Sequence, residues 1–74
     1  MIMVRVDKEL ERAREKFPSW PRDMIHAAAI VAEEAGELLR ASLQYHFEEE
    51  KTLEDCDRET IHILAMCIRF LEGK

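Results

Sequence analysis

Residues 24–39 read Met-Ile-His-Ala-Ala-Ala-Ile-Val-Ala-Glu-Glu-Ala-Gly-Glu-Leu-Leu, and this stretch decides the fold. It contains no proline, and it lacks the apolar–polar alternation of a half-buried β-strand. On a helical wheel, Glu33, Glu34 and Glu37 share a wedge about 100° wide, while much of the opposite arc is apolar. The stretch therefore predicts the middle of a long helix, from about residue 21 to about residue 46, with a carboxylate cluster on one face.

Helical spacing recurs on both sides of this stretch. Apolar residues at intervals of three and four near the N-terminus predict a short amphipathic first helix. They are Met3, Val6, Leu10, Ala13 and Phe17. After a loop at residues 48–51, Thr52 and Asp55 resemble a capping box. They predict a third helix that runs to about Leu71, with Gly73 at its C-terminal stop.

The fold class that follows is all-α, as a single domain over residues 1–74. We expect a short N-terminal helix plus a long antiparallel helical hairpin. A chain of 74 residues buries only about 60% of its unfolded surface. Residues 24–32 and 61–71 are also apolar on more sides than a monomer can cover. We therefore expect a homodimer or homotetramer, in which oligomerisation completes a four-helix-bundle-like core.

Charge, hydropathy and cysteine spacing predict which partners, which location and which disulfides to expect. Sixteen acidic and eleven basic residues give a net charge of −5, which argues against a nucleic-acid partner. No targeting leader and no apolar run near the roughly 18 residues that span a bilayer are present, so we expect a cytoplasmic protein without membrane contact. Cys56 and Cys67 fall about 16 Å apart on the predicted third helix, too far for a disulfide, and are expected to be reduced.

The glutamate cluster has two interpretations. Acidic helices often carry glutamates on a solvated face, and spacing alone favours that interpretation. Two like charges 6 Å apart repel by roughly 3 kcal/mol at an effective dielectric constant of 20, but by less than about 1 kcal/mol in water. The cluster is therefore costly in a packed environment unless a cation binds. Its apolar flanks make a divalent cation the second interpretation.

The predicted third helix contributes a second pair of candidate ligands. Glu59 and His62 are three residues apart, so they share one helix face just before the apolar residues 63–68. A single histidine there is more often a hydrogen-bonded boundary residue. Paired with Glu59, and facing glutamates from an antiparallel neighbour, it becomes a credible metal ligand. Carboxylates suit Mg²⁺ or Mn²⁺, and an imidazole shifts the preference towards Mn²⁺, Fe or Zn.

This order of motifs resembles the MazG-like all-α nucleoside triphosphate pyrophosphohydrolases. The resemblance covers roughly residues 16–72. The matching segments are similar to those of short phage and bacterial members. They include KFPSWP at 16–21, HAAAIVAEEAGEL at 26–38, RETIH at 58–62 and AMCIRFLE at 65–72.

The resemblance implies both a reaction and a set of residues. Glu34, Glu37, Glu59 and His62 would hold Mg²⁺ (or Mn²⁺), and Glu33 would act as the catalytic base that orients a water. The substrate would be a nucleoside triphosphate, cleaved at the α-phosphorus to a nucleoside monophosphate and pyrophosphate. House-cleaning of the nucleotide pool is one role for such an activity.

One residue departs from the pattern of that family. Members usually carry Asp at the last motif position, where this chain has His62. Losing an acidic ligand weakens Mg²⁺ binding. A Glu-x-x-Asp sequence does occur at Glu54 and Asp57, but it lies before the apolar stretch, so register favours Glu59 and His62. Arg40, Lys51, Arg58 and Arg69 are scattered and form no basic cluster for phosphates.

Two other functions fit the same residues. Di-metal (iron) carboxylate proteins place Glu-x-x-His pairs and further glutamates inside a helical bundle, and a homodimer of this chain would supply them. A non-catalytic MazG-like helical assembly module would keep the fold without the reaction.

Overall fold

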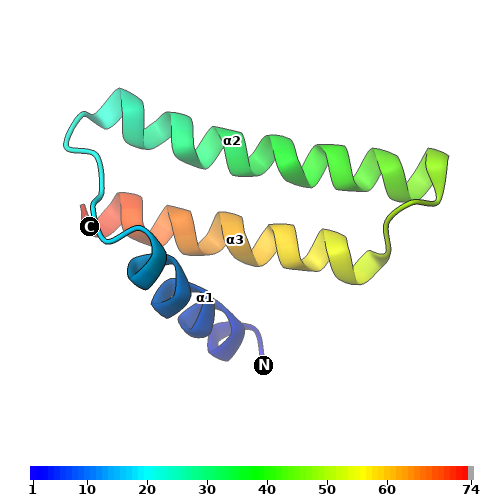
Figure 1. Cartoon of the computed structure of the whole chain (residues 1–74), viewed down its shortest axis with the longest axis horizontal. Helices are drawn as coiled ribbons and strands as arrows, with labels where there is room; N and C mark the ends of the chain where they lie inside the picture. Colours follow the sequence, from blue (N-terminus) through cyan, green and yellow to red (C-terminus); the bar gives the residue numbers. More distant parts are fainter. Residues whose placement is uncertain (74) are drawn as a thin grey trace.

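The computed structural model describes residues 1–73 as three α-helices with no strand (Figure 1). Helix α1 spans Ile2–Lys16, α2 spans Met24–Leu43 and α3 spans Leu53–Glu72. A π-helical turn, η1, continues α2 over Gln44–Glu48. The prediction of an all-α chain is confirmed. Within residues 1–73, no helix combines the length and the apolar character needed to cross a membrane.

The helices pack around α3. Helices α2 and α3 lie side by side and run in opposite directions, and α1 crosses α3 obliquely (Figure 1). The segment between α1 and α2 passes the C-terminal end of α3. This arrangement places α3 between α1 and α2, so side chains of α3 can meet residues from both other helices.

Local hydrogen bonds fix where α2 begins. Asp23 is its N-cap, and Oδ1 of Asp23 accepts the backbone N–H of Ile25 at 3.1 Å. The predicted start at about residue 21 was three residues early, because an aspartate at the N-cap satisfies an otherwise unpaired backbone donor. After η1, Glu49 adopts a left-handed backbone with φ of 56° and ends the helical run.

Both predicted ends of α3 are confirmed. The backbone N–H of Asp55 donates to Oγ1 of Thr52 at 3.1 Å, and the backbone N–H of Thr52 donates to Oδ2 of Asp55 at 2.8 Å. This reciprocal pair is a capping box. Gly73, with φ of 72°, closes the helix in the left-handed region. Cys56 and Cys67 form no disulfide, as predicted.

The hydrophobic core is small and joins α1 to α3. Val6 and Leu10 pack against Ile61 and Ala65, all of them less than 9% exposed. Several large apolar side chains remain in solvent instead. They include Met24, Ile25, Leu39, Phe47 and Leu71, which are 61–83% exposed. The core therefore explains why α1 packs on α3, but it leaves much of the apolar surface of α2 exposed to solvent.

Candidate metal centre

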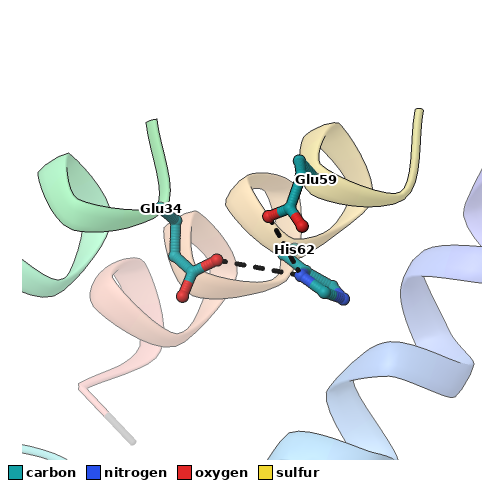
Figure 2. Close-up of side chains that lie close together, drawn as sticks. All are labelled: Glu34, Glu59 and His62. Atoms are coloured by element: carbon teal, nitrogen blue, oxygen red, sulfur yellow. Dashed lines mark ion pairs between the residues drawn. The ribbon is translucent and has the colours of Figure 1, made fainter. Parts of the chain in front are cut away.

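Three candidate ligands converge between α2 and α3 (Figure 2). Glu34 comes from α2, and Glu59 and His62 come from successive turns of α3. One ligand atom from each lies within 4.8 Å of the others, and all three residues are half-buried. Among residues 1–73, no other group of three His, Cys, Asp or Glu side chains meets so closely.

The imidazole of His62 lies at the centre of this group. Its Nδ1 atom is 3.8 Å from Oε2 of Glu34 and 3.6 Å from Oε2 of Glu59. On the other side of the ring, Nε2 is 3.6 Å from Oε1 of Glu9 in α1. These separations are longer than hydrogen bonds. The ring is thus surrounded by carboxylates from all three helices.

Glu9 is held in place by a neighbour on its own helix. Arg12 donates from Nε to Oε1 of Glu9 at 2.8 Å and from Nη2 to Oε2 at 2.6 Å. This hydrogen bonding lowers the pKa of Glu9, and the nearby charge of His62 lowers it further against the opposing effect of burial. Sequence reasoning missed Glu9. Its place beside Leu10, on the edge of the apolar stripe of the first helix, was the available signal.

The electrostatic environment of Glu34 is the reverse of that of Glu9. Burial raises the pKa of Glu34, and the nearby charges of Glu59, Glu33 and Glu37 raise it further. The charge of His62 opposes this rise. The centre therefore disfavours its own negative charge, and an added cation would relieve that repulsion.

The other predicted site residues lie around this group rather than in it. Glu33 and Glu37 are both exposed, and neither belongs to the group of mutually close ligand atoms. Glu33 borders the larger cavity described below, and Glu37 borders a second, polar cavity that it shares with Glu59. Glu54 and Asp57, the alternative acidic pair, are also exposed and outside the group.

A cavity of about 610 Å³ opens next to the centre. It lies between α1, the segment that follows it, α2 and α3, and its walls are mostly apolar. Its lining includes Phe17, Trp20, Ile30 and Met66 together with Glu34 and His62. A cavity of this size with two aromatic side chains is suited to a flat organic ring.

Arg69 also borders this cavity but is bound to the backbone. It is 2% exposed, and its Nη2 donates to the carbonyl oxygen of Phe17 at 2.8 Å. The carbonyl oxygens of Ala13 and Ser19 each lie 3.5 Å from the guanidinium nitrogens. The guanidinium also stacks 4.9 Å from the centroid of the Trp20 ring. Arg69 therefore fixes the α1–α2 segment and with it one wall of the cavity.

The polar cavity of about 380 Å³ lies on the other side of Glu59. Its lining includes two basic side chains, Arg40 and Lys51, and two glutamates besides Glu59, which are Glu37 and Glu50. The sequence showed these basic residues only as scattered positions. The structure places them in one cavity, within reach of the candidate centre.

No protein-family model matches the chain, and no curated protein or solved structure is significantly similar to it. The centre is therefore interpreted from its own geometry. Ligands about 2.1 Å from an ion lie about 3.4 Å apart at the tetrahedral angle. Nδ1 of His62 is already 3.8 Å and 3.6 Å from the two carboxylates, and all three ligand atoms lie within 4.8 Å of one another. Side-chain shifts of about 1 Å would therefore close the group around an ion. Two carboxylates and an imidazole are donors that suit Mn²⁺, Fe or Zn, and the carboxylates also suit Mg²⁺.

Proposed function

We propose that the protein is a metal-dependent nucleoside triphosphate pyrophosphohydrolase of the MazG-like kind. One observation carries the proposal: the group formed by Glu34, Glu59 and His62 lies next to an apolar cavity with aromatic side chains, and Glu59 also lines a polar cavity that holds Arg40 and Lys51 beside three glutamates. The parts of a nucleotide follow the same order in space as these three features. Its base is a flat ring, and its phosphates are anionic and bind divalent metal.

The two cavities suggest how a nucleotide would lie. The base would enter the apolar cavity and contact Phe17 and Trp20, because nucleobases stack well on aromatic rings. The terminal phosphates would extend towards Arg40 and Lys51 in the polar cavity. The glutamates of that cavity would repel them, so this placement depends on the bound cation.

The proposed chemistry uses the residues that the sequence singles out. Glu34, Glu37, Glu59 and His62 would hold Mg²⁺ or Mn²⁺, which when bound neutralises phosphate charge and polarises the phosphoryl oxygen. Glu33 is exposed at the edge of the apolar cavity, where it can orient a water and accept its proton. Attack of that water on the α-phosphorus breaks the bond to the bridging oxygen and releases pyrophosphate. An enzyme of free nucleotides would act in the cytoplasm.

The test is release of pyrophosphate by the purified protein with Mg²⁺ or Mn²⁺ across canonical and modified nucleotides. We expect Glu59→Gln to lower kcat/KM by at least about 100-fold, because it removes a charged ligand at the centre of the site. Glu54→Gln, an exposed residue on the same helix, is the matched control and should retain activity. The absence of pyrophosphate release from every nucleotide would refute the proposed function and leave the di-metal carboxylate protein and the non-catalytic assembly module.

A second candidate function is a di-metal (iron) carboxylate protein. The specific observation in its favour is the closeness of the Glu59 and His62 pair to Glu34, since such proteins combine Glu-x-x-His with further glutamates. Anaerobic titration should then show stoichiometric Fe²⁺ binding, followed by oxidation on exposure to air. Failure of either step removes this candidate.

We also propose that a second copy of the chain covers the exposed apolar surface. Part of that surface is an apolar cavity of about 400 Å³ between α2 and α3. It is lined by Ala28, Val31, Cys67, Phe70 and Leu71. Dimerisation, or assembly of a tetramer, would complete a four-helix-bundle-like core there. Light scattering should give the mass of a homodimer or homotetramer, and Leu71→Glu should shift it to the monomer.

A further inference from the structure

The two nitrogens of His62 face different helices. Nδ1 faces Glu34 and Glu59, the two carboxylates of the candidate centre, whereas Nε2 faces Glu9 of α1. Figure 2 shows the side of the ring that faces the centre. Since only one nitrogen of a neutral imidazole has a lone pair to give, the other must carry the proton.

Histidines that bind metals need a partner for that second nitrogen. In metal sites the remaining N–H is usually donated to a carboxylate or a carbonyl, which fixes the tautomer, orients the ring and makes the ligand nitrogen more basic. Glu9 has the geometry for this role. Its carboxylate is gripped by two hydrogen bonds from Arg12, and its side chain is only 11% exposed.

We propose that Glu9 is a positioning residue that accepts the Nε2–H of His62 and so presents Nδ1 to Glu34 and Glu59 as a metal-binding nitrogen. The inference rests on the proposed metal centre and goes beyond it, because it assigns a role to a residue of α1. The 3.6 Å separation of Nε2 and Oε1 is a few tenths of an ångström longer than a hydrogen bond, so the role requires the Glu9 carboxylate to move towards the ring by about that amount.

This role explains how a histidine can stand at the position of an acidic ligand. A neutral imidazole brings no charge to a divalent ion. A carboxylate that accepts the hydrogen bond from the other ring nitrogen makes the ligand nitrogen more basic, which partly compensates for the missing charge. Helix α1 thus takes part in the metal centre through Glu9, in addition to its apolar packing on α3 through Val6 and Leu10.

The first experiment measures Mn²⁺ affinity by electron paramagnetic resonance, without substrate. Glu9→Ala should weaken Mn²⁺ binding by about 10–100-fold, the range for loss of such a partner. Glu9→Gln keeps an acceptor oxygen without the charge and should recover part of the loss. Glu11→Ala, an exposed glutamate of the same helix, is the matched control and should bind as the wild type does.

A double-mutant comparison separates positioning from a general effect of charge or folding. In a His62→Asp background no imidazole remains to be oriented, so Glu9→Ala should change Mn²⁺ affinity by less than about twofold. An equal loss in both backgrounds, or no loss in either, would overturn the proposal. Nitrogen-15 shifts of His62 supply an independent readout: the protein should hold the Nε2–H tautomer, and Glu9→Ala should produce a mixture.

These outcomes are distinct from those of the proposed function. If the wild type binds Mn²⁺ and depends on Glu9 but releases no pyrophosphate, the positioning role stands and the hydrolase does not. If Mn²⁺ does not bind to the wild type at all, both proposals are wrong.

Discussion

Two polar side chains on one face of α3 have opposite surroundings. His62 and Arg69 are seven residues apart, about two helical turns, and both border the larger cavity. Arg69 is 2% exposed and donates hydrogen bonds to backbone carbonyls at the end of α1. The side chain of His62 is 24% exposed, and its ring nitrogens face three carboxylates at 3.6–3.8 Å.

The difference separates a structural residue from a candidate functional one. The partners of Arg69 are fixed, neutral carbonyls, so the guanidinium is satisfied whenever the chain is folded. The partners of His62 are charged side chains that repel one another, and burial makes that repulsion stronger. We therefore expect Arg69 to control stability under all conditions and the His62 centre to respond to added cations.

The largest expected effect comes from removing the guanidinium of Arg69. Arg69→Met keeps the apolar stem but removes the donors to the part-buried carbonyl oxygens of Phe17 and Ser19, and should cost about 3 kcal/mol of unfolding free energy. Urea unfolding measures it. The matched control is Arg14→Met, because Arg14 pairs with Glu72 on the surface and should be worth less than about 1 kcal/mol. Equal losses in the two variants would contradict the structural role of Arg69.

The second effect is stabilisation by metal. Mn²⁺ at 100 times its dissociation constant should stabilise the folded protein by about 2.7 kcal/mol, which thermal unfolding detects. A double variant, Glu34→Gln with Glu59→Gln, should lose this gain because it removes both carboxylates of the centre. Glu54→Gln with Asp57→Asn removes as many charges from exposed positions and should keep it. A gain that survives in the first double variant would rule out this centre.

The parts of the fold that the sequence predicted are those that depend on neighbours along the chain. Thr52 and Asp55 form a capping box within four residues, and Gly73 ends α3 through its own backbone freedom. Glu59 and His62 share a helix face because of helical spacing alone. The same logic failed at the start of α2, which was predicted at about residue 21, because Asp23 was not considered as the N-cap.

The parts that could not be predicted depend on how helices cross. Glu9 meets His62 only because α1 packs on α3 at one angle, and no spacing along the chain encodes that contact. For the same reason the sequence grouped Glu34 and Glu37, which lie one turn apart on a single helix. The structure brings only Glu34 together with Glu59 and His62, because these residues face one another across two helices.

The smallest expected effects are on the stability of the metal-free protein, and they distinguish Glu34 and Glu9, two of the glutamates around His62. Burial raises the pKa of Glu34, so the folded state binds a proton more readily than the unfolded state does, and stability falls as pH rises through that window. Glu34→Gln removes this penalty and should stabilise the protein at pH 7 by less than about 1 kcal/mol. The gain should vanish below about pH 4.5, the ordinary pKa of glutamate.

Glu9 should behave in the opposite way, because hydrogen bonding from Arg12 lowers its pKa. The stability it contributes is present above its unfolded pKa and is lost as pH falls through the lower, folded value. Glu9→Gln should therefore destabilise the protein at pH 7, by about 1 kcal/mol or less, and have no effect in strong acid. Thermal unfolding of both variants between pH 3 and 7 measures the two signs. If both variants shifted stability in the same direction, the carboxylates around His62 would be equivalent, and the contrast between an anchored Glu9 and a repelled Glu34 would be wrong.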